Sequence, residues 1–333
     1  MARVVHFYQT GGPEVLQIED ETIGEPGAGE ARIRIQSIGL NRAEAAFRSG
    51  TYIEQPVFPS RIGYEASGII EALGDANSGF NAGDPVCILP EFSMTRYGVC
   101  AESAIVPSAA LIKRPVELNE IESAAVWMPY MTAWGALSEL APFTASDAVI
   151  ITAASSSVGL AAIQVAHRLG ALPIAVTRTA EKRDALLASG APHVIVSAEE
   201  NIAERVMAIT HGKGARMVFD PIAGPGVSDL AAALGPRGVF VIYGNLSGRG
   251  HETPFPYMQA MRKSLTMRPY LIFADMANKA RHAAACEFIL SGLKDKSLKP
   301  IIAKTFTLDQ IVDAYQYLES NQQIGKVVVT VPR

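Results

Sequence analysis

One segment near the middle of the chain limits its fold more than any other. Residues 149–159 read Val-Ile-Ile-Thr-Ala-Ala-Ser-Ser-Ser-Val-Gly, an apolar run followed by small residues. The run predicts a buried strand, and a helix is expected to follow from Val158 to Leu169. A strand, a tight turn and a helix in this order leave free backbone N–H groups and the positive end of the helix dipole where a phosphate can bind. The segment therefore predicts a dinucleotide-binding βα unit.

The turn of this unit departs from the usual glycine pattern, G-x-G-x-x-G. Ala154, Ser156 and Gly159 stand at the three glycine positions. An ordinary βα turn is the alternative, but the further strand expected at Pro173–Thr177 favours a nucleotide site. The residues expected to hold the pyrophosphate are Ser155, Ser156, Ser157, Val158 and Gly159.

The residues after that second strand indicate which dinucleotide binds. NAD-binding proteins place an acidic residue about 20 positions beyond the glycines, where it binds the ribose 2′-hydroxyl. Here Thr177 is followed directly by Arg178, and Lys182 comes shortly afterwards. Two cations suit a 2′-phosphate, so the sequence predicts NADPH; solvated basic residues on a plain turn are the alternative.

A chain of 333 residues predicts two domains. The first third has short Ile- and Val-rich runs between turn signals, which predicts a partly open β-barrel. From residue 148 onward strands and helices alternate, which predicts an α/β domain with a doubly wound, parallel, six-stranded sheet. Its strands are expected at Ala148–Thr152, Pro173–Thr177, His193–Val196, Met217–Asp220, Val239–Tyr243 and Thr266–Ile272.

The pattern changes again near the C-terminus. A long helix is expected over Met276–Leu290 and a linker over Lys294–Pro300. The segment Ile301–Val331 then predicts a strand, a helix and a strand, which would return to the first domain because the α/β sheet is already complete. The predicted domains are residues 1–124 with 296–333, and residues 125–295.

Composition excludes several classes of protein. The net charge is −4 without a long basic run, which argues against nucleic-acid binding. Cys87, Cys100 and Cys286 lie far apart, so neither a disulfide framework nor a cysteine-rich zinc lobe is expected. No signal-peptide pattern begins the chain, and no apolar run reaches the roughly 18 residues of a membrane span. These features predict a cytosolic protein that binds no membrane.

Seven short motifs in order along nearly the whole chain resemble the zinc-independent quinone oxidoreductases (zeta-crystallin-like) of the medium-chain dehydrogenase/reductase superfamily. The resemblance implies a GroES-like barrel domain that binds substrate, a Rossmann domain that binds NADPH, and a cleft between them. Members also form homodimers through the edge of the Rossmann sheet, so Thr266–Ile272 is expected at such an interface. The motifs are Gly39-Leu40-Asn41, Arg48-Ser49-Gly50-Thr51-Tyr52, Gly63-Tyr64-Glu65-Ala66-Ser67-Gly68, Gly83-Asp84-Pro85-Val86, Pro129-Tyr130-Met131-Thr132-Ala133, Tyr243-Gly244-Asn245-Leu246-Ser247-Gly248 and Gly325-Lys326-Val327-Val328.

The positions at which zinc-bearing relatives bind their metal carry other residues here. By resemblance, this chain has Asn41 and Tyr64 at two of those positions and, by a looser alignment, Met128 at the third. These three side chains are not a zinc ligand set. Alcohol oxidation in the relatives uses zinc as a Lewis acid, whereas a quinone or an enone is already electrophilic. The sequence therefore predicts metal-free hydride transfer to a small quinone or an α,β-unsaturated carbonyl.

The expected catalytic residues are Tyr52, Asn41 and Thr132. Tyr52 would hydrogen-bond the substrate oxygen or relay a proton, with simple packing as the alternative. Asn41 would orient the nicotinamide or the substrate, and Thr132 would contact the nicotinamide unless it only caps a helix. The resemblance and the strand order add Tyr243, Asn245, Ser247 and Lys326 as cofactor contacts, a surface lysine being the alternative for Lys326. Glu65 is expected to support the fold.

Two other functions stay open at this point. The chain could bind NADPH with little turnover, as an accessory protein. It could also be an enoyl-thioester reductase, although no basic rim for coenzyme A is evident.

Overall fold

The computed structural model describes all residues except 76–78, 141 and 332–333. The chain separates into two compact units, one formed by Met1–Met128 with Pro300–Arg333 and the other by Pro129–Lys299. The sequence indicated divisions after residues 124 and 295. Within the described residues, no helix combines the length and the apolar character that a bilayer span requires.

The first unit contains two sheets. The smaller has the order β2-β1-β4, and the larger has the order β15-β16-β3-β5-β6-β8 with β7 also paired to β3. Their bounds are β1 (Ala2–Phe7), β2 (Gln17–Glu21), β3 (Glu30–Gly39), β4 (Ser60–Arg61), β5 (Glu65–Leu73), β6 (Pro85–Ile88), β7 (Ser103–Pro107), β8 (Leu111–Lys113), β15 (Ile302–Thr307) and β16 (Lys326–Thr330). The helices of this unit are α1 (Arg42–Arg48), α2 (Glu120–Ser123) and α11 (Ile311–Glu319).

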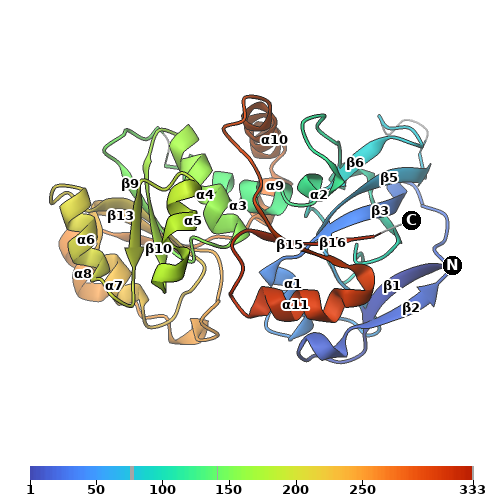
Figure 1. Ribbon diagram of the computed structural model, residues 1–333, viewed down its shortest axis with the longest axis horizontal. Coiled ribbons are helices and arrows are strands. Elements are labelled where there is room, and N and C mark those ends of the chain that lie inside the picture. Colours follow the sequence, from blue (N-terminus) through green and yellow to red (C-terminus); the bar gives the residue numbers. More distant parts are fainter. Residues whose placement is uncertain (76–78, 141, 332–333) are drawn as a thin grey trace. The chain divides into compact units, whose positions relative to one another are not determined.

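The C-terminal tail returns to this first unit, as the sequence predicted. β16 runs antiparallel to β3, with Val328 opposite Gly39, and α11 lies between β15 and β16 in the chain (Figure 1). The side chains of β3 alternate between buried and half-buried because one face of the sheet covers the core. This pairing places Lys326, the first residue of β16, near the end of β3.

The second unit is a Rossmann fold. Its strands are all parallel and have the order β11-β10-β9-β12-β13-β14. Successive strands are therefore added outward in one direction from β9 and in the other direction from β12, which makes the β9–β12 junction the topological switch point. They are β9 (Ala148–Ile151), β10 (Leu172–Thr177), β11 (His193–Val196), β12 (Ala215–Asp220), β13 (Leu234–Ile242) and β14 (Thr266–Pro269). The helices are α3 (Trp127–Ser138), α4 (Ser157–Arg168), α5 (Arg183–Ala188), α6 (Ile202–Ile209), α7 (Val227–Ala232), α8 (Tyr257–Lys263), α9 (Phe273–Ala277) and α10 (Lys279–Lys294).

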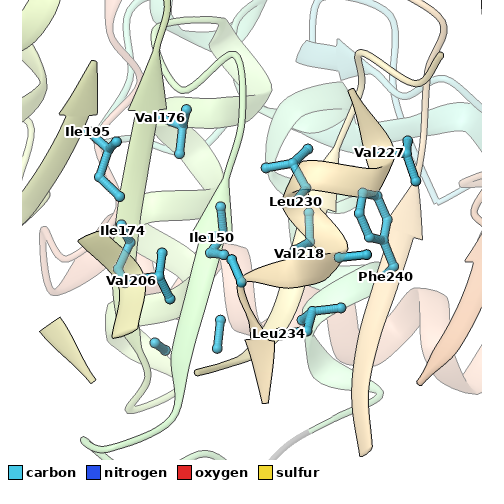
Figure 2. Close-up of a cluster of buried hydrophobic side chains, with 14 residues drawn as sticks. Ile150, Ile174, Val176, Ile195, Val206, Val218, Val227, Leu230, Leu234 and Phe240 are labelled. Atoms are coloured by element: carbon cyan, nitrogen blue, oxygen red, sulfur yellow. The ribbon is translucent and has the colours of Figure 1, made fainter. Parts of the chain in front are cut away.

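The core of this sheet explains why its central strands are apolar along their length. Figure 2 shows side chains of neighbouring strands, among them Ile150, Ile174 and Phe240, packed with Val206 of α6 and Leu230 of α7. Strands covered by helices on both faces bury every side chain, which produces continuous apolar runs rather than alternation.

Three predicted elements differ clearly from the structure. The fifth strand begins at Leu234 rather than Val239. The sixth strand ends at Pro269 rather than Ile272; Pro269 pairs with Ile242, where the neighbouring strand β13 also ends. The long helix predicted over Met276–Leu290 is two helices, α9 and α10, separated at Asn278. The Asn278 side chain accepts hydrogen bonds from two N–H groups of α10 and so begins a new helix.

Candidate active site

The phosphate turn predicted in the second unit is tight. α4 begins directly after Ser156, whose Oγ accepts a hydrogen bond from the Gly159 N–H at 3.0 Å. A Cβ on Gly159 would lie 2.6 Å from the Ala154 carbonyl oxygen, so this third position requires glycine. The serine at the second position thus caps the helix, and the remaining N–H groups of its first turn, at Ser157 and Val158, form the expected anion site.

The two predicted cations lie at the end of β10. Lys182 Nζ donates to Ser155 Oγ at 3.1 Å, which ties the basic segment to the phosphate turn. The pKa of Lys182 lies below its ordinary value because the side chain is partly buried and because Arg178 repels its charge. Arg178 is exposed, and Thr177 is buried. Two cations that repel each other here would be stabilised by an anion.

The loop that follows β13 lies beside the loop that follows β12. The Ser247 N–H donates to the Ile222 carbonyl at 3.0 Å, and Ser247 Oγ accepts from the Arg249 N–H at 3.1 Å. Asn245 is exposed. Tyr243 stacks on Phe219, with ring centroids 4.0 Å apart. These predicted cofactor contacts therefore lie at the carboxyl ends of neighbouring parallel strands, where open α/β sheets bind ligands.

One polar residue at the carboxyl ends of these strands was not predicted. Asp220, at the end of β12, is fully buried and accepts hydrogen bonds from the Thr152 hydroxyl and from the Ala223 N–H. Burial raises its pKa above the ordinary value. Through its bond to Thr152, Asp220 links the carboxyl ends of β9 and β12, the two neighbouring strands at the topological switch point. An acidic residue directly after the apolar run Met217–Phe219 was the available signal.

Lys326 is buried in the first unit, so the surface alternative for it is wrong, and its role as a cofactor contact stays a prediction. Its ammonium donates to Asn41 Oδ1 at 2.7 Å and to Glu65 Oε2 at 2.6 Å. Lys326 is 1% exposed and Glu65 0%. The Met128 N–H donates to the other Glu65 oxygen at 3.2 Å. The three positions at which zinc relatives bind metal thus belong to segments that converge on one buried ammonium.

A second buried carboxylate holds Asn41 from the other side. Glu44 accepts from the Asn41 N–H at 2.9 Å, from the Asn41 Nδ2 at 3.1 Å, from the Tyr64 N–H at 3.0 Å and from the Tyr315 hydroxyl at 2.8 Å. Asn41 Nδ2 also donates to the Gly39 carbonyl. Both amide hydrogens of Asn41 are therefore engaged within the protein. Glu44 could have been predicted from the sequence, since Asn41 and Glu44 have the spacing of a capping box.

Tyr52 lies on the loop after α1 and belongs to an aromatic cluster. Its ring packs edge-on against Tyr64, which in turn packs against Phe92, and Phe92 against Tyr97. Burial raises the pKa of Tyr52 to about 12. The phenol is therefore neutral at physiological pH and can donate a proton or a hydrogen bond.

Thr132 does not start a helix, so the capping alternative for it is wrong. It lies in the interior of α3 and is 8% exposed. Trp127 and Trp134 on the same helix are buried, as expected for packing residues.

The residues at the metal positions do not fit zinc. Asn41 Oδ1 already binds an ammonium, and a second cation there would be repelled by it. Tyr64 is a fully buried phenol. Among the residues that the structure describes, no three His, Cys, Asp or Glu side chains gather into a metal-binding group.

Comparison with known proteins identifies the family. A family profile for zinc-binding dehydrogenases matches residues 157–289, and one for the alcohol dehydrogenase GroES-like domain matches residues 27–116. A 2-haloacrylate reductase from a Burkholderia species is 30% identical over 99% of this chain and 98% of its own length. The human quinone oxidoreductase is 29% identical over 99% of this chain and 98% of its own. The chain belongs to the zinc-independent quinone oxidoreductase branch of the medium-chain dehydrogenase/reductase superfamily.

A solved structure of this superfamily shares the whole fold. Escherichia coli quinone oxidoreductase, complexed with NADPH, has a TM-score of 0.90 at 27% identity and covers 98% of this chain and 99% of its own. The GroES-like barrel and the six-stranded Rossmann sheet predicted from the sequence are thereby confirmed. The family description 'zinc-binding dehydrogenase' covers a wider group that includes metal-bearing members. At two positions that correspond to zinc ligands in those members, this chain has Asn41 and Tyr64.

Replacing the buried ammonium tests its role in the fold. Lys326→Met should lower the free energy of unfolding at neutral pH by about 3–5 kcal/mol, because Glu65 keeps a buried charge without its partner. Burial already holds the pKa of Glu65 above the ordinary value, and the ammonium opposes that shift. Its loss raises the pKa further, so the folded variant gains a proton as the pH falls and the deficit shrinks. Urea denaturation at pH 8 and pH 5 measures both values.

Two controls accompany this measurement. Lys113→Met removes an exposed lysine 3.7 Å from Asp84, and it should cost less than about 1 kcal/mol. Adding Glu65→Gln to Lys326→Met should recover part of the loss. A deficit of equal size at both pH values would contradict the assignment of a buried charge.

Proposed function

We propose that this protein reduces quinones or α,β-unsaturated carbonyl compounds with NADPH and without a metal. The observation that carries the proposal is the Lys326 ammonium bound to Asn41 Oδ1. With a cation already fixed there, the chain lacks the Lewis acid that removes an alcohol proton in zinc enzymes. A substrate that is electrophilic by itself needs no such activation.

The residues of the second unit fit NADPH. The Gly159 turn and the first turn of α4 would hold the pyrophosphate, and Arg178 with Lys182 would hold the 2′-phosphate. Tyr243, Asn245 and Ser247 at the ends of neighbouring strands, together with Thr132, would line the rest of the cofactor. When bound, the cofactor supplies the hydride.

The remaining chemistry falls to residues of the chain. Tyr52 presents a neutral phenol that would donate a hydrogen bond to the substrate oxygen and then a proton. Asn41 cannot serve with its amide hydrogens, which Gly39 and Glu44 occupy. Its role would be to hold the start of α1, and with it the loop that carries Tyr52, in one position.

Relatives support this choice of substrate. The 2-haloacrylate reductase is named for a substrate with an activated C=C bond, and several other relatives are named quinone oxidoreductases. Both classes accept hydride at an electron-poor centre. We therefore place activated C=C and quinone C=O bonds ahead of enoyl thioesters.

A substrate screen tests the proposal. The purified protein should oxidise NADPH with ortho-quinones or enones, should contain less than one tenth of an equivalent of zinc, and should keep its rate in EDTA. Metal analysis by mass spectrometry and NADPH absorbance at 340 nm measure these quantities. One tightly held zinc per chain would overturn the metal-free mechanism. NADPH binding without turnover would favour an accessory role, and preference for crotonyl thioesters would favour an enoyl reductase.

Cofactor preference follows from the paired cations. NADPH should bind more tightly than NADH, and Arg178→Ala should weaken NADPH binding by about 1–3 kcal/mol while leaving NADH binding nearly unchanged. Fluorescence titration gives both dissociation constants. Lys213→Ala is the matched control, because Lys213 is an exposed cation before the start of β12, at the other end of the sheet. Equal affinities for the two cofactors in the wild type would refute the assignment.

We further propose that the protein is a homodimer joined through β14. In the described part of the sheet, β14 ends the strand order and pairs with β13 alone. Arg268, which would guard this edge with its charge, is paired with Glu139 of the same unit. Leu271, just beyond the strand, is 39% exposed. An unpaired apolar edge favours association with another copy.

Sedimentation at micromolar concentration should give the mass of two chains. Leu271→Asp should shift that mass toward one chain, because it buries a charge at the interface. The control Leu187→Asp, on exposed α5, should leave the dimer intact. A wild type that sediments as a single chain would rule the dimer out.

A further inference from the structure

Tyr64 is a buried phenol that the proposed mechanism does not use. It follows Gly63, whose φ of +108° turns the chain sharply and whose Cβ, if present, would lie 2.8 Å from Cys100 Sγ. The Tyr64 N–H donates to Glu44 at 3.0 Å. The backbone of Tyr64 is thus fixed by a turn that needs glycine and by a buried carboxylate. The family resemblance leaves this phenol unexplained, since metal-binding relatives have an imidazole at this position.

The Tyr64 ring is held between two others. Its centroid lies 6.5 Å from that of Tyr52, with the rings inclined at 65°, and 5.8 Å from that of Phe92. The Tyr64 hydroxyl lies 3.5 Å from Glu54 Oε2, a long hydrogen bond. Glu54 is half-buried, so its carboxylate reaches solvent. Tyr64 therefore stands between the predicted proton donor, Tyr52, and a carboxylate in contact with water.

The two phenols are hydrogen-bonded to each other, and this bond lowers the pKa of Tyr52, although burial is the larger influence and raises it. Either hydroxyl can act as donor or acceptor, so Tyr64 can donate to Tyr52. The Tyr64 proton thus has two acceptors, the Tyr52 oxygen and Glu54 Oε2. A hydroxyl can rotate between such partners.

We infer that Tyr64 is a relay residue that returns a proton to Tyr52 after each turnover, along the path Glu54–Tyr64–Tyr52. The inference rests on the proposed function, in which Tyr52 donates the proton that accompanies hydride transfer. Tyr64 touches neither substrate nor cofactor in this assignment and acts through Tyr52. The relay would matter most while bound substrate keeps water away from Tyr52, because Glu54 would then be the route by which a proton from water reaches it.

The proton balance closes without a further reactant. The Tyr52 O–H bond breaks, its proton joins the substrate anion formed by hydride addition, and the electron pair stays on Tyr52 as a phenolate. The Tyr64 O–H bond then breaks and its proton forms the new Tyr52 O–H bond. Glu54, protonated from solvent, passes its proton to Tyr64 and returns to a carboxylate. Each turnover consumes one proton from water.

The test compares two hydroxyl deletions in the same aromatic cluster. Tyr64→Phe should lower kcat for an enone on the order of tenfold with little change in KM, because general-acid steps contribute at least that much. Tyr97→Phe is the matched control: Tyr97 packs on Phe92, but its hydroxyl donates to Glu30. It should leave kcat unchanged. The proton inventory in H₂O–D₂O mixtures should change from curved in the wild type to linear in Tyr64→Phe.

Restoring a proton carrier separates relay from packing. Tyr64→His, assayed with EDTA, should recover part of the rate lost in Tyr64→Phe. Its kcat should fall as the pH rises through about 6.5, where imidazole loses its proton. Neither the wild type nor Tyr64→Phe should show that inflection. If Tyr64→His matches Tyr64→Phe at every pH, Tyr64 only packs and the inference is wrong.

A measurement without turnover checks the coupling directly. A fluorinated tyrosine incorporated at position 52 titrates where the protein stays folded, and its absorbance midpoint should move to higher pH in Tyr64→Phe. An unmoved midpoint would overturn the inference. If Tyr52→Phe slows turnover while Tyr64→Phe does not, the relay fails but the proposed donor stands. If Tyr52→Phe has no effect, the proposed donor and the relay both fail.

Discussion

The first unit depends on one buried ion pair, between Lys326 and Glu65. Two carboxylates, Glu65 and Glu44, are fully buried there, and burial alone would drive both toward the neutral form. The Lys326 ammonium and a set of N–H and O–H donors hold them in place. Because Lys326 of β16 and Tyr315 of α11 come from the C-terminal tail, neither carboxylate has all of its partners until that tail closes onto the barrel.

The second unit was largely predictable from the sequence because its signals are local. A strand, a turn and a helix follow one another within residues 149–168, and strands covered on both faces by helices appear as continuous apolar runs. Errors occurred at the ends of elements. β14 ends at Pro269, opposite the end of its neighbour β13, and the Asn278 side chain begins α10 by accepting hydrogen bonds from its first N–H groups.

The buried network was not predictable in the same way. Lys326 and Asn41 are 285 positions apart in the chain, and no periodicity relates one to the other. Lysine is rarely buried, which is why a surface position stood as the alternative to a cofactor contact. Glu44 could have been found, since it completes a capping box with Asn41. Its further partners, Tyr64 and Tyr315, become neighbours only when α1, the Gly63 turn and α11 pack together.

The same network limits how this protein could be redesigned. Installing a zinc site would require more than Asn41→Cys and Tyr64→His, because the ammonium would still lie within hydrogen-bonding distance of position 41. Removing Lys326 as well would leave Glu65 without its counter-ion and weaken the closure of the tail. A series of substitutions from this chain toward a metal site would therefore pass through variants less stable than the starting protein.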